Sequence, residues 1–136
     1  FASSALLREM LRAKARGVDV RMIFPHENDS NLLDKNNRSV AKRMLDGGVK
    51  VYMYQPRFSH IKAIVVDGWA CVGSANCDTL SLRINEEFNI AFSDEKSVER
   101  LVKDLFLEDI RRSKKLSKED ARGWYIPLIE GVAGQL

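Results

Sequence analysis

The sequence predicts an α/β domain with a mixed, largely parallel sheet flanked by helices on both faces. Two segments with helical periodicity alternate with two short runs rich in β-branched and aromatic residues, and the string Gly-Val-x-Val opens both runs, at Gly17 and at Gly48. Each run stops at a proline, Pro25 or Pro56. Because a parallel return needs a helix to carry the chain back, this alternation favours parallel strands joined by right-handed crossovers.

The first elements follow directly from these signals. Ser3 or Ser4 can cap a helix that ends near Gly17, and the strand 18–24 comes next. A second amphipathic helix over 32–45 precedes the strand 49–54. We therefore expect two helix–strand units in succession.

The second half of the chain begins with the segment 60–67, which is apolar on both faces and is typical of a central strand covered by helices. Gly68 allows a turn into an antiparallel strand over 69–73, and a strand at 87–93 follows a polar loop. A long helix with its apolar face between Val98 and Ile110 ends the regular structure.

Composition narrows the class of protein. The 136 residues, 45% hydrophobic and 30% charged, predict one globular domain over 1–136. The net charge of +3 suits a phosphate-bearing partner without indicating nucleic acid. Cys71 and Cys77 lack the CxxC spacing of zinc and redox sites, so we expect reduced thiols in an intracellular protein. No apolar run approaches the roughly 20 residues that span a bilayer, and the start at Phe1, inside a helix, suggests part of a longer chain.

The candidate catalytic residues lie around the strand 60–67. His60 and Lys62 are two positions apart, so an extended strand would place both side chains on one face. An ammonium neutralises phosphoryl oxygens, and an imidazole serves as nucleophile or general acid near neutral pH. This pair alone has many false matches, but the string continues at fixed spacing with Asp67, Gly73-Ser74 and Asn76, and Glu87 follows.

This string, H-x-K-x4-D followed by x5-G-S-x-N, resembles the HKD motif of the phospholipase D superfamily. The segments GVKVYMYQPRFSHIKAIVVD and GSANCDTLSLRINEEFNIAFSD are most similar to the cardiolipin synthase branch, and so is WYIPLIEG near the end. Leu82 and Glu86 depart from that branch, which more often has an aromatic residue there. The resemblance implies a phospholipase D-like half with one HKD motif, a C-terminal fragment of a two-motif protein.

The resemblance and the residue chemistry together suggest a role for each motif residue. His60 would attack phosphorus and form a phosphohistidine, while Lys62 and Asn76 would bind the non-bridging oxygens and Ser74 would add a hydrogen bond to the substrate. Glu87 would accept the Nδ1 proton of His60 and leave Nε2 free. Gly73 would allow a tight turn. We expect neither metal nor cofactor.

Asp67 is expected to have a structural role. Its offset of seven residues from His60 places it on the opposite face of an extended strand, roughly 23 Å away, so we assign it to turn and strand-end hydrogen bonding.

The predicted function is phosphatidyl transfer between phosphatidylglycerol-like lipids, at the cytoplasmic side of the membrane, by a peripheral protein. The alternatives are a phospholipase D or nuclease, and a half-domain that binds lipid or a partner without catalysis. We expect a second HKD half, from the parent chain or a homodimer, and regard nucleic acid as an unlikely substrate.

Other candidate residues are weaker. His26 is more typical of an ordinary surface loop, and a metal site built from Glu27, Asp29, Asp67 and Asp78 lacks any known ligand spacing. The basic segment 111–118 is expected to be a solvated helix end, with attraction to a membrane surface as the alternative. Trp124 and Tyr125 suit either a core or an interface.

Overall fold

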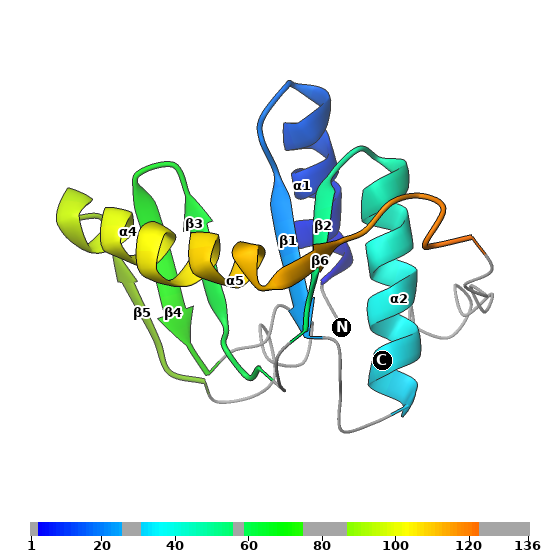
Figure 1. Ribbon diagram of the computed structural model, residues 1–136. Coiled ribbons are helices and arrows are strands. Elements are labelled where there is room, and N and C mark those ends of the chain that lie inside the picture. Colours follow the sequence, from blue (N-terminus) through cyan, green and yellow to red (C-terminus); the bar gives the residue numbers. More distant parts are fainter. Residues whose placement is uncertain (1–2, 26–30, 56–58, 75–86, 123–136) are drawn as a thin grey trace.

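The computed structural model describes residues 3–25, 31–55, 59–74 and 87–122. Its strands form two three-stranded sheets, ordered β1-β2-β6 and β3-β4-β5 (Figure 1). The strands are β1 Arg21–Pro25, β2 Lys50–Tyr54, β3 Ala63–Val66, β4 Trp69–Gly73, β5 Asn89–Phe92 and β6 Ser113–Lys115. The helices are α1 Ser4–Ala15, α2 Asn31–Asp46, α4 Glu95–Leu101, the π-helical turn η1 Val102–Phe106 and α5 Leu107–Arg111.

The first sheet contains the predicted parallel pair. β1 and β2 run parallel, with Arg21 opposite Lys50 and Pro25 opposite Tyr54. Helix α2 connects them, which confirms the helix–strand alternation read from the sequence. The mixed α/β fold class is therefore confirmed.

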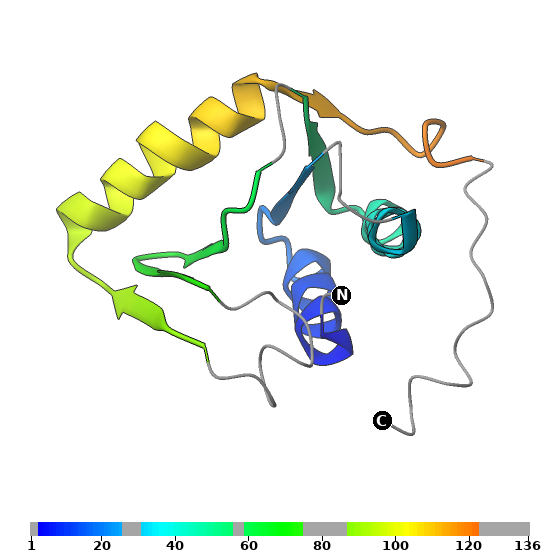
Figure 2. The same ribbon diagram turned by 90° about the horizontal axis from the view of Figure 1, so that it is seen from below.

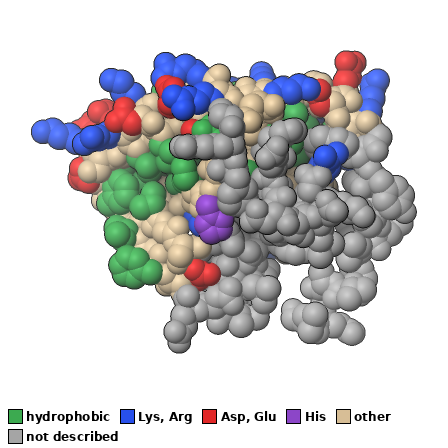
Figure 3. Space-filling model, turned by 60° about the horizontal axis from the view of Figure 1, so that its bottom comes forward, with side chains coloured by type: hydrophobic (Ala, Val, Ile, Leu, Met, Phe, Trp, Pro, Cys, Tyr) green, Lys and Arg blue, Asp and Glu red, His purple; other side chains and the backbone are tan. Residues whose placement is uncertain are grey.

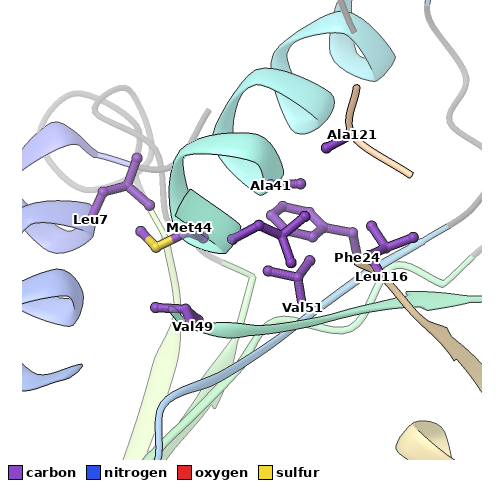
Figure 4. Close-up of a cluster of buried hydrophobic side chains, with 9 residues drawn as sticks. Leu7, Phe24, Ala41, Met44, Val49, Val51, Leu116 and Ala121 are labelled. Atoms are coloured by element: carbon purple, nitrogen blue, oxygen red, sulfur yellow. The ribbon is translucent and has the colours of Figure 1, made fainter. Parts of the chain in front are cut away.

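The main core lies between this sheet and the helices α1 and α2 (Figure 4). Met44 of α2 and Val51 of β2 are completely buried at its centre. Such residues dominate folding because each fully buried aliphatic side chain contributes about 1.5–3 kcal/mol. The cluster consists of Leu7, Phe24, Ala41, Met44, Leu45, Val49, Val51, Leu116 and Ala121.

Both faces of β2 are covered, as expected for an inner strand. Tyr52 and Tyr54 alternate with Val51 along the strand and so point to the opposite face, yet both are buried. Because both are buried, other parts of the chain must cover the face of β2 that points away from the α1–α2 core.

An ion cluster joins the beginnings of β1 and β2. The Asp19 carboxylate lies 2.6 Å from the Arg21 guanidinium and 2.8 Å from Lys50 Nζ. Hydrogen bonds from Arg21 and then from Lys50 hold the pKa of Asp19 well below its usual range. The cluster is partly solvent-exposed, so it aligns the two strands more than it stabilises them.

The basic segment 111–118 is only in part what the sequence indicated. Its lysines are exposed, but Ser113–Lys115 form β6, which pairs antiparallel with Tyr52–Tyr54 of β2. The expectation of a helix end alone is wrong, because buried Leu116 anchors the segment in the core and brings its backbone to the edge of β2.

The second sheet corrects the predicted position of the strand 60–67. Regular pairing begins at Ala63, and in the described pairings β3 lies at a sheet edge beside β4, with Val66 57% exposed. The sequence predicts a single, largely parallel sheet. The described residues instead form two sheets, with one parallel strand pairing and three antiparallel ones. The antiparallel pairing of β3 with β4 across Asp67-Gly68 is as predicted. The physical reason for two sheets is that β6 pairs with the edge of β2 away from β1, so this edge is not open to β3.

The segment from Glu95 to Arg111 is helical throughout and runs past the β3-β4-β5 sheet (Figure 2). Asp94 caps its start by accepting a hydrogen bond from the Ser97 N–H at 3.0 Å. This confirms the predicted helix, whose buried contact includes Val98. No helix in the described parts of the chain is long and apolar enough to cross a bilayer.

Candidate active site

The candidate site lies at the end of the β3-β4-β5 sheet opposite the Asp67-Gly68 turn. Antiparallel pairing of β3 with β4 continues beyond β3, because the Gly73 N–H donates to the Lys62 carbonyl oxygen at 3.2 Å. The ladder then passes to the next strand, where the Ser74 N–H donates to the Phe88 carbonyl oxygen at 3.0 Å. The backbone thus brings three separate parts of the motif to one edge.

His60 and Lys62 are in direct contact there. Lys62 Nζ lies 2.8 Å from His60 Nδ1 and 2.9 Å from the His60 carbonyl oxygen. A protonated lysine has only donors, so Nδ1 is the acceptor and a neutral ring carries its proton on Nε2. This tautomer is the opposite of the one that the predicted nucleophilic role requires.

Partial burial affects Lys62 more than any neighbouring charge does. Desolvation lowers the pKa of Lys62 below its usual value, and the negative charge of Glu87 opposes this effect. A cation that has lost part of its hydration gains more from an anionic ligand than a fully hydrated one does. Lys62 is therefore suited to bind a phosphoryl group.

Glu87 is held in place by Ser74. The Ser74 hydroxyl donates to Glu87 Oε2 at 2.5 Å, and the Phe88 N–H donates to Ser74 Oγ at 3.0 Å. The side chain and the main chain of Ser74 thus both bond to the segment that carries Glu87. Ser74 and Glu87 are 13 residues apart, and the sequence alone does not predict their contact, because only the strand pairing brings them together.

Gly73 permits this close approach. A methyl group at position 73 would lie 2.7 Å from Asn89 Cα, and closer still to Asn89 Oδ1 and the Phe88 carbonyl oxygen. Two of these atoms belong to the backbone of the neighbouring strand. The position therefore requires glycine for space, since its φ lies outside the left-handed region.

Comparisons with known proteins identify the family. The family described as "Cardiolipin synthase, PLD-like domain" matches residues 1–109. The chain belongs to this phospholipase D-like family. It is 40% identical over 119 residues to the probable cardiolipin synthase YwiE of Bacillus subtilis, covering 86% of this chain and 24% of that protein. It is 38% identical over 137 residues to a cardiolipin synthase of Listeria welshimeri, covering 98% of this chain and 28% of that protein.

A comparison of folds gives one further match. The crystal structure of a phospholipase D family member, Nuc from Salmonella typhimurium, matches with a TM-score of 0.71 at 19% identity, over 86% of this chain and 76% of that one. The chain spans about a quarter of the length of the curated relatives, between 24% and 28%.

The phospholipase D-like motif is partly assembled in the described residues. His60, Lys62, Ser74 and Glu87 meet at one sheet edge, with Gly73 beneath them. Asp67 lies at the other end of the hairpin, in the turn before β4, with a φ of 50°. A left-handed φ is tolerated by aspartate better than by most residues, which is consistent with the structural role assigned to it.

Several sequence candidates fall outside the described residues. These are Asn76, His26, Cys77, Glu27, Asp29, Asp78, Leu82, Glu86, Trp124 and Tyr125. In the part of the chain that the structure covers, no three His, Cys, Asp or Glu side chains gather as they would around a metal ion.

Proposed function

We propose that this chain is the motif-bearing part of a cardiolipin synthase-like phosphatidyl transferase that acts through a phosphohistidine. The observation that carries the proposal is the cluster of imidazole, partly desolvated ammonium and anchored carboxylate at one sheet edge. The names of the relatives support phosphatidyl transfer over other phosphodiester chemistry.

In the first step, His60 Nε2 would attack phosphorus of a phosphatidylglycerol-like lipid. A P–N bond forms as the P–O bond to the leaving glycerol breaks, and the leaving oxygen takes a proton from a general acid. In the second step the general acid, now deprotonated, takes the proton of the acceptor lipid's hydroxyl, whose oxygen attacks phosphorus as the P–N bond to His60 breaks. Transfer to water would instead give the phospholipase reaction.

The resting contact between Lys62 and His60 must change for this reaction. Incoming phosphoryl oxygens would draw Lys62 Nζ away from His60 Nδ1, and Asn76 would share in binding them. The ring could then give up its Nε2 proton to solvent and take one up at Nδ1, whose N–H donates a hydrogen bond to Glu87 Oε1, which leaves the Nε2 lone pair free for attack. The roles of His60, Lys62 and Glu87 thus stay those proposed from the motif.

A second half would complete the site. The mechanism needs an acid opposite His60, and the large side chains of Ile61, Phe88 and Ile90 are 57%, 74% and 52% exposed beside the motif. Figure 3 shows hydrophobic side chains gathered at the surface near the histidine. This supports a surface covered by a second HKD half, from a longer parent chain or from a homodimer.

The substrate and its location follow from the same proposal. A phospholipid substrate requires the active site to reach a membrane surface, and we propose that this chain acts on the cytoplasmic side. The net charge of +3 is small for a protein that binds nucleic acid tightly, because each phosphate contact recruits a Lys or Arg.

The test uses the full-length protein that contains this chain, with phosphatidylglycerol vesicles and single-stranded DNA as alternative substrates. We expect cardiolipin formation, its loss in His60→Ala, and its retention both in the exposed-helix control Lys96→Ala and in excess chelator. A reaction with labelled lipid that is quenched in detergent at mildly alkaline pH, where the P–N bond is stable, should trap label on wild type alone. Cleavage of DNA without lipid products would support the nuclease, and activity restored only by added metal would refute the metal-independent mechanism.

A further inference from the structure

We infer that Ser74 is a positioning residue that acts through Glu87, and that its hydroxyl does not bind the substrate phosphate. The inference rests on the proposed function, which supplies the reaction in which Glu87 takes part. It replaces the substrate-binding role that the motif alone suggested for Ser74.

The hydrogen bonds of Ser74 carry the inference. A hydroxyl has one proton, and that of Ser74 is donated to Glu87 Oε2 at 2.5 Å. Its oxygen in turn accepts the Phe88 N–H at 3.0 Å. Donation to a carboxylate is charge-assisted and about twice as strong as a neutral hydrogen bond, so a phosphate oxygen does not displace it easily. Ser74 therefore has no proton left for the substrate.

The backbone explains why a small hydroxyl residue stands at this position. The Ser74 N–H bonds to the Phe88 carbonyl, so the serine is locked to the residue that follows Glu87. Gly73 allows the two strands to approach closely enough for this contact. With Oε2 held by Ser74, the other carboxylate oxygen is the one available to the His60 ring. Ser74 thus sets the orientation of the carboxylate that selects the tautomer of His60.

The experiment compares Ser74→Ala and Ser74→Thr in the full-length protein, with a soluble chromogenic phosphodiester as substrate. Misplacement of a catalytic group by about 1 Å costs about a hundredfold in rate. We therefore expect Ser74→Ala to lower kcat by about 10- to 100-fold with KM changed less than about threefold, and Ser74→Thr, which keeps the hydroxyl, to restore most of kcat.

A double-mutant cycle tests whether the effect passes through Glu87. In a Glu87→Gln background, Ser74→Ala should cost little more, because residues that act as one unit are not additive. Independent, multiplicative losses would overturn the inference. A raised KM in Ser74→Ala with kcat unchanged would also overturn it, because that pattern marks lost ground-state binding.

A binding measurement separates the inference from the proposed function. Titration with inorganic phosphate should give the same affinity for wild type and Ser74→Ala, and a weaker one for Lys62→Met. Weaker phosphate binding by Ser74→Ala would show that the hydroxyl is a ligand after all. If wild type cleaves no phosphodiester, the proposed function fails, while this titration still decides the role of Ser74. Should Ser74→Ala not fold, Ser74→Cys replaces it, because a thiol is a much weaker donor than a hydroxyl. Its kcat should fall with KM little changed, and full activity in that variant would refute the inference.

Discussion

Replacing Gly73 by alanine is the sharpest test of the site geometry. The added methyl group would lie 2.7 Å from Asn89 Cα and closer to Asn89 Oδ1 and the Phe88 carbonyl oxygen. Backbone atoms cannot rotate away as a side chain can, so the end of β4 must separate from the segment 87–89. Overpacking of this kind costs about 1–3 kcal/mol, and loss of the Ser74–Phe88 backbone hydrogen bond adds about 1 kcal/mol.

The change should lower both stability and activity. We expect Gly73→Ala to lose about 2–4 kcal/mol in urea unfolding followed by circular dichroism. Activity on a soluble phosphodiester should fall about a hundredfold while the protein is still folded, because Glu87 moves with the separated strand.

Gly68→Ala provides the matched control in the same hairpin. No atom lies within 4 Å of the position that its Cβ would take, and its φ lies outside the left-handed region. We therefore expect wild-type activity and a change in the free energy of unfolding within about 0.5 kcal/mol. If the two variants have equal unfolding midpoints and equal activity, the close approach at Gly73 is not what assembles the site.

Three further predictions address the core, the ion cluster and the site. Met44→Ala should cost about 2–5 kcal/mol in chemical unfolding, because Met44 is completely buried, whereas Val18→Ala, at a residue 44% exposed, should change stability little. The lowered pKa of Asp19 means that its stabilising contribution is full above the pKa of an unfolded aspartate and is lost as pH falls toward the depressed folded value. Asp19→Asn should therefore flatten the acid side of the stability curve, and an unchanged slope in acid titrations would contradict this assignment. Because burial lowers the pKa of Lys62 and Glu87 opposes this, phosphate affinity should decline at alkaline pH, and at a lower pH still in Glu87→Gln, as measured by titration calorimetry.

The sequence predicted the order of elements, the parallel pairing of β1 with β2 and the antiparallel pairing of β3 with β4, but not the division of the described strands into two sheets. Helical periodicity and the paired Gly-Val-x-Val strings indicated α1, β1, α2 and β2 because local pattern determines these elements. The strand 60–67 was placed at the centre of a sheet because it is apolar on both faces. Apolar character shows that a surface is suited to burial, but it does not identify the covering element, and β3 lies at an edge in the described pairings.

In the candidate site, too, local spacing predicts some features, whereas others depend on how distant segments pair. The spacing of His60 and Lys62 predicted that both side chains lie on one face, since residues two apart on an extended chain share a face. It did not predict that Lys62 Nζ would contact His60 Nδ1. The bond between Ser74 and Glu87 could not be predicted, because it depends on the register between two segments 13 residues apart. The basic side chains of 111–118 favoured a solvated helix end. The backbone of Ser113–Lys115 nevertheless pairs with β2 as β6, because this pairing does not depend on the exposed lysine side chains.

The hairpin explains why the motif has fixed spacing even though Asp67 lies far from the chemistry. A two-residue turn at Asp67-Gly68 pairs Val66 with Trp69 and, four residues further along, brings Lys62 opposite Gly73. One residue more or less in this turn would shift the register and move every side chain of β4 to the other face. The Ser74 hydroxyl would then no longer reach Glu87. We therefore expect Asp67 to act on the site through register: its tolerance of a left-handed φ keeps the turn short, and the short turn brings Lys62, the proposed phosphate ligand, level with Gly73 and Ser74.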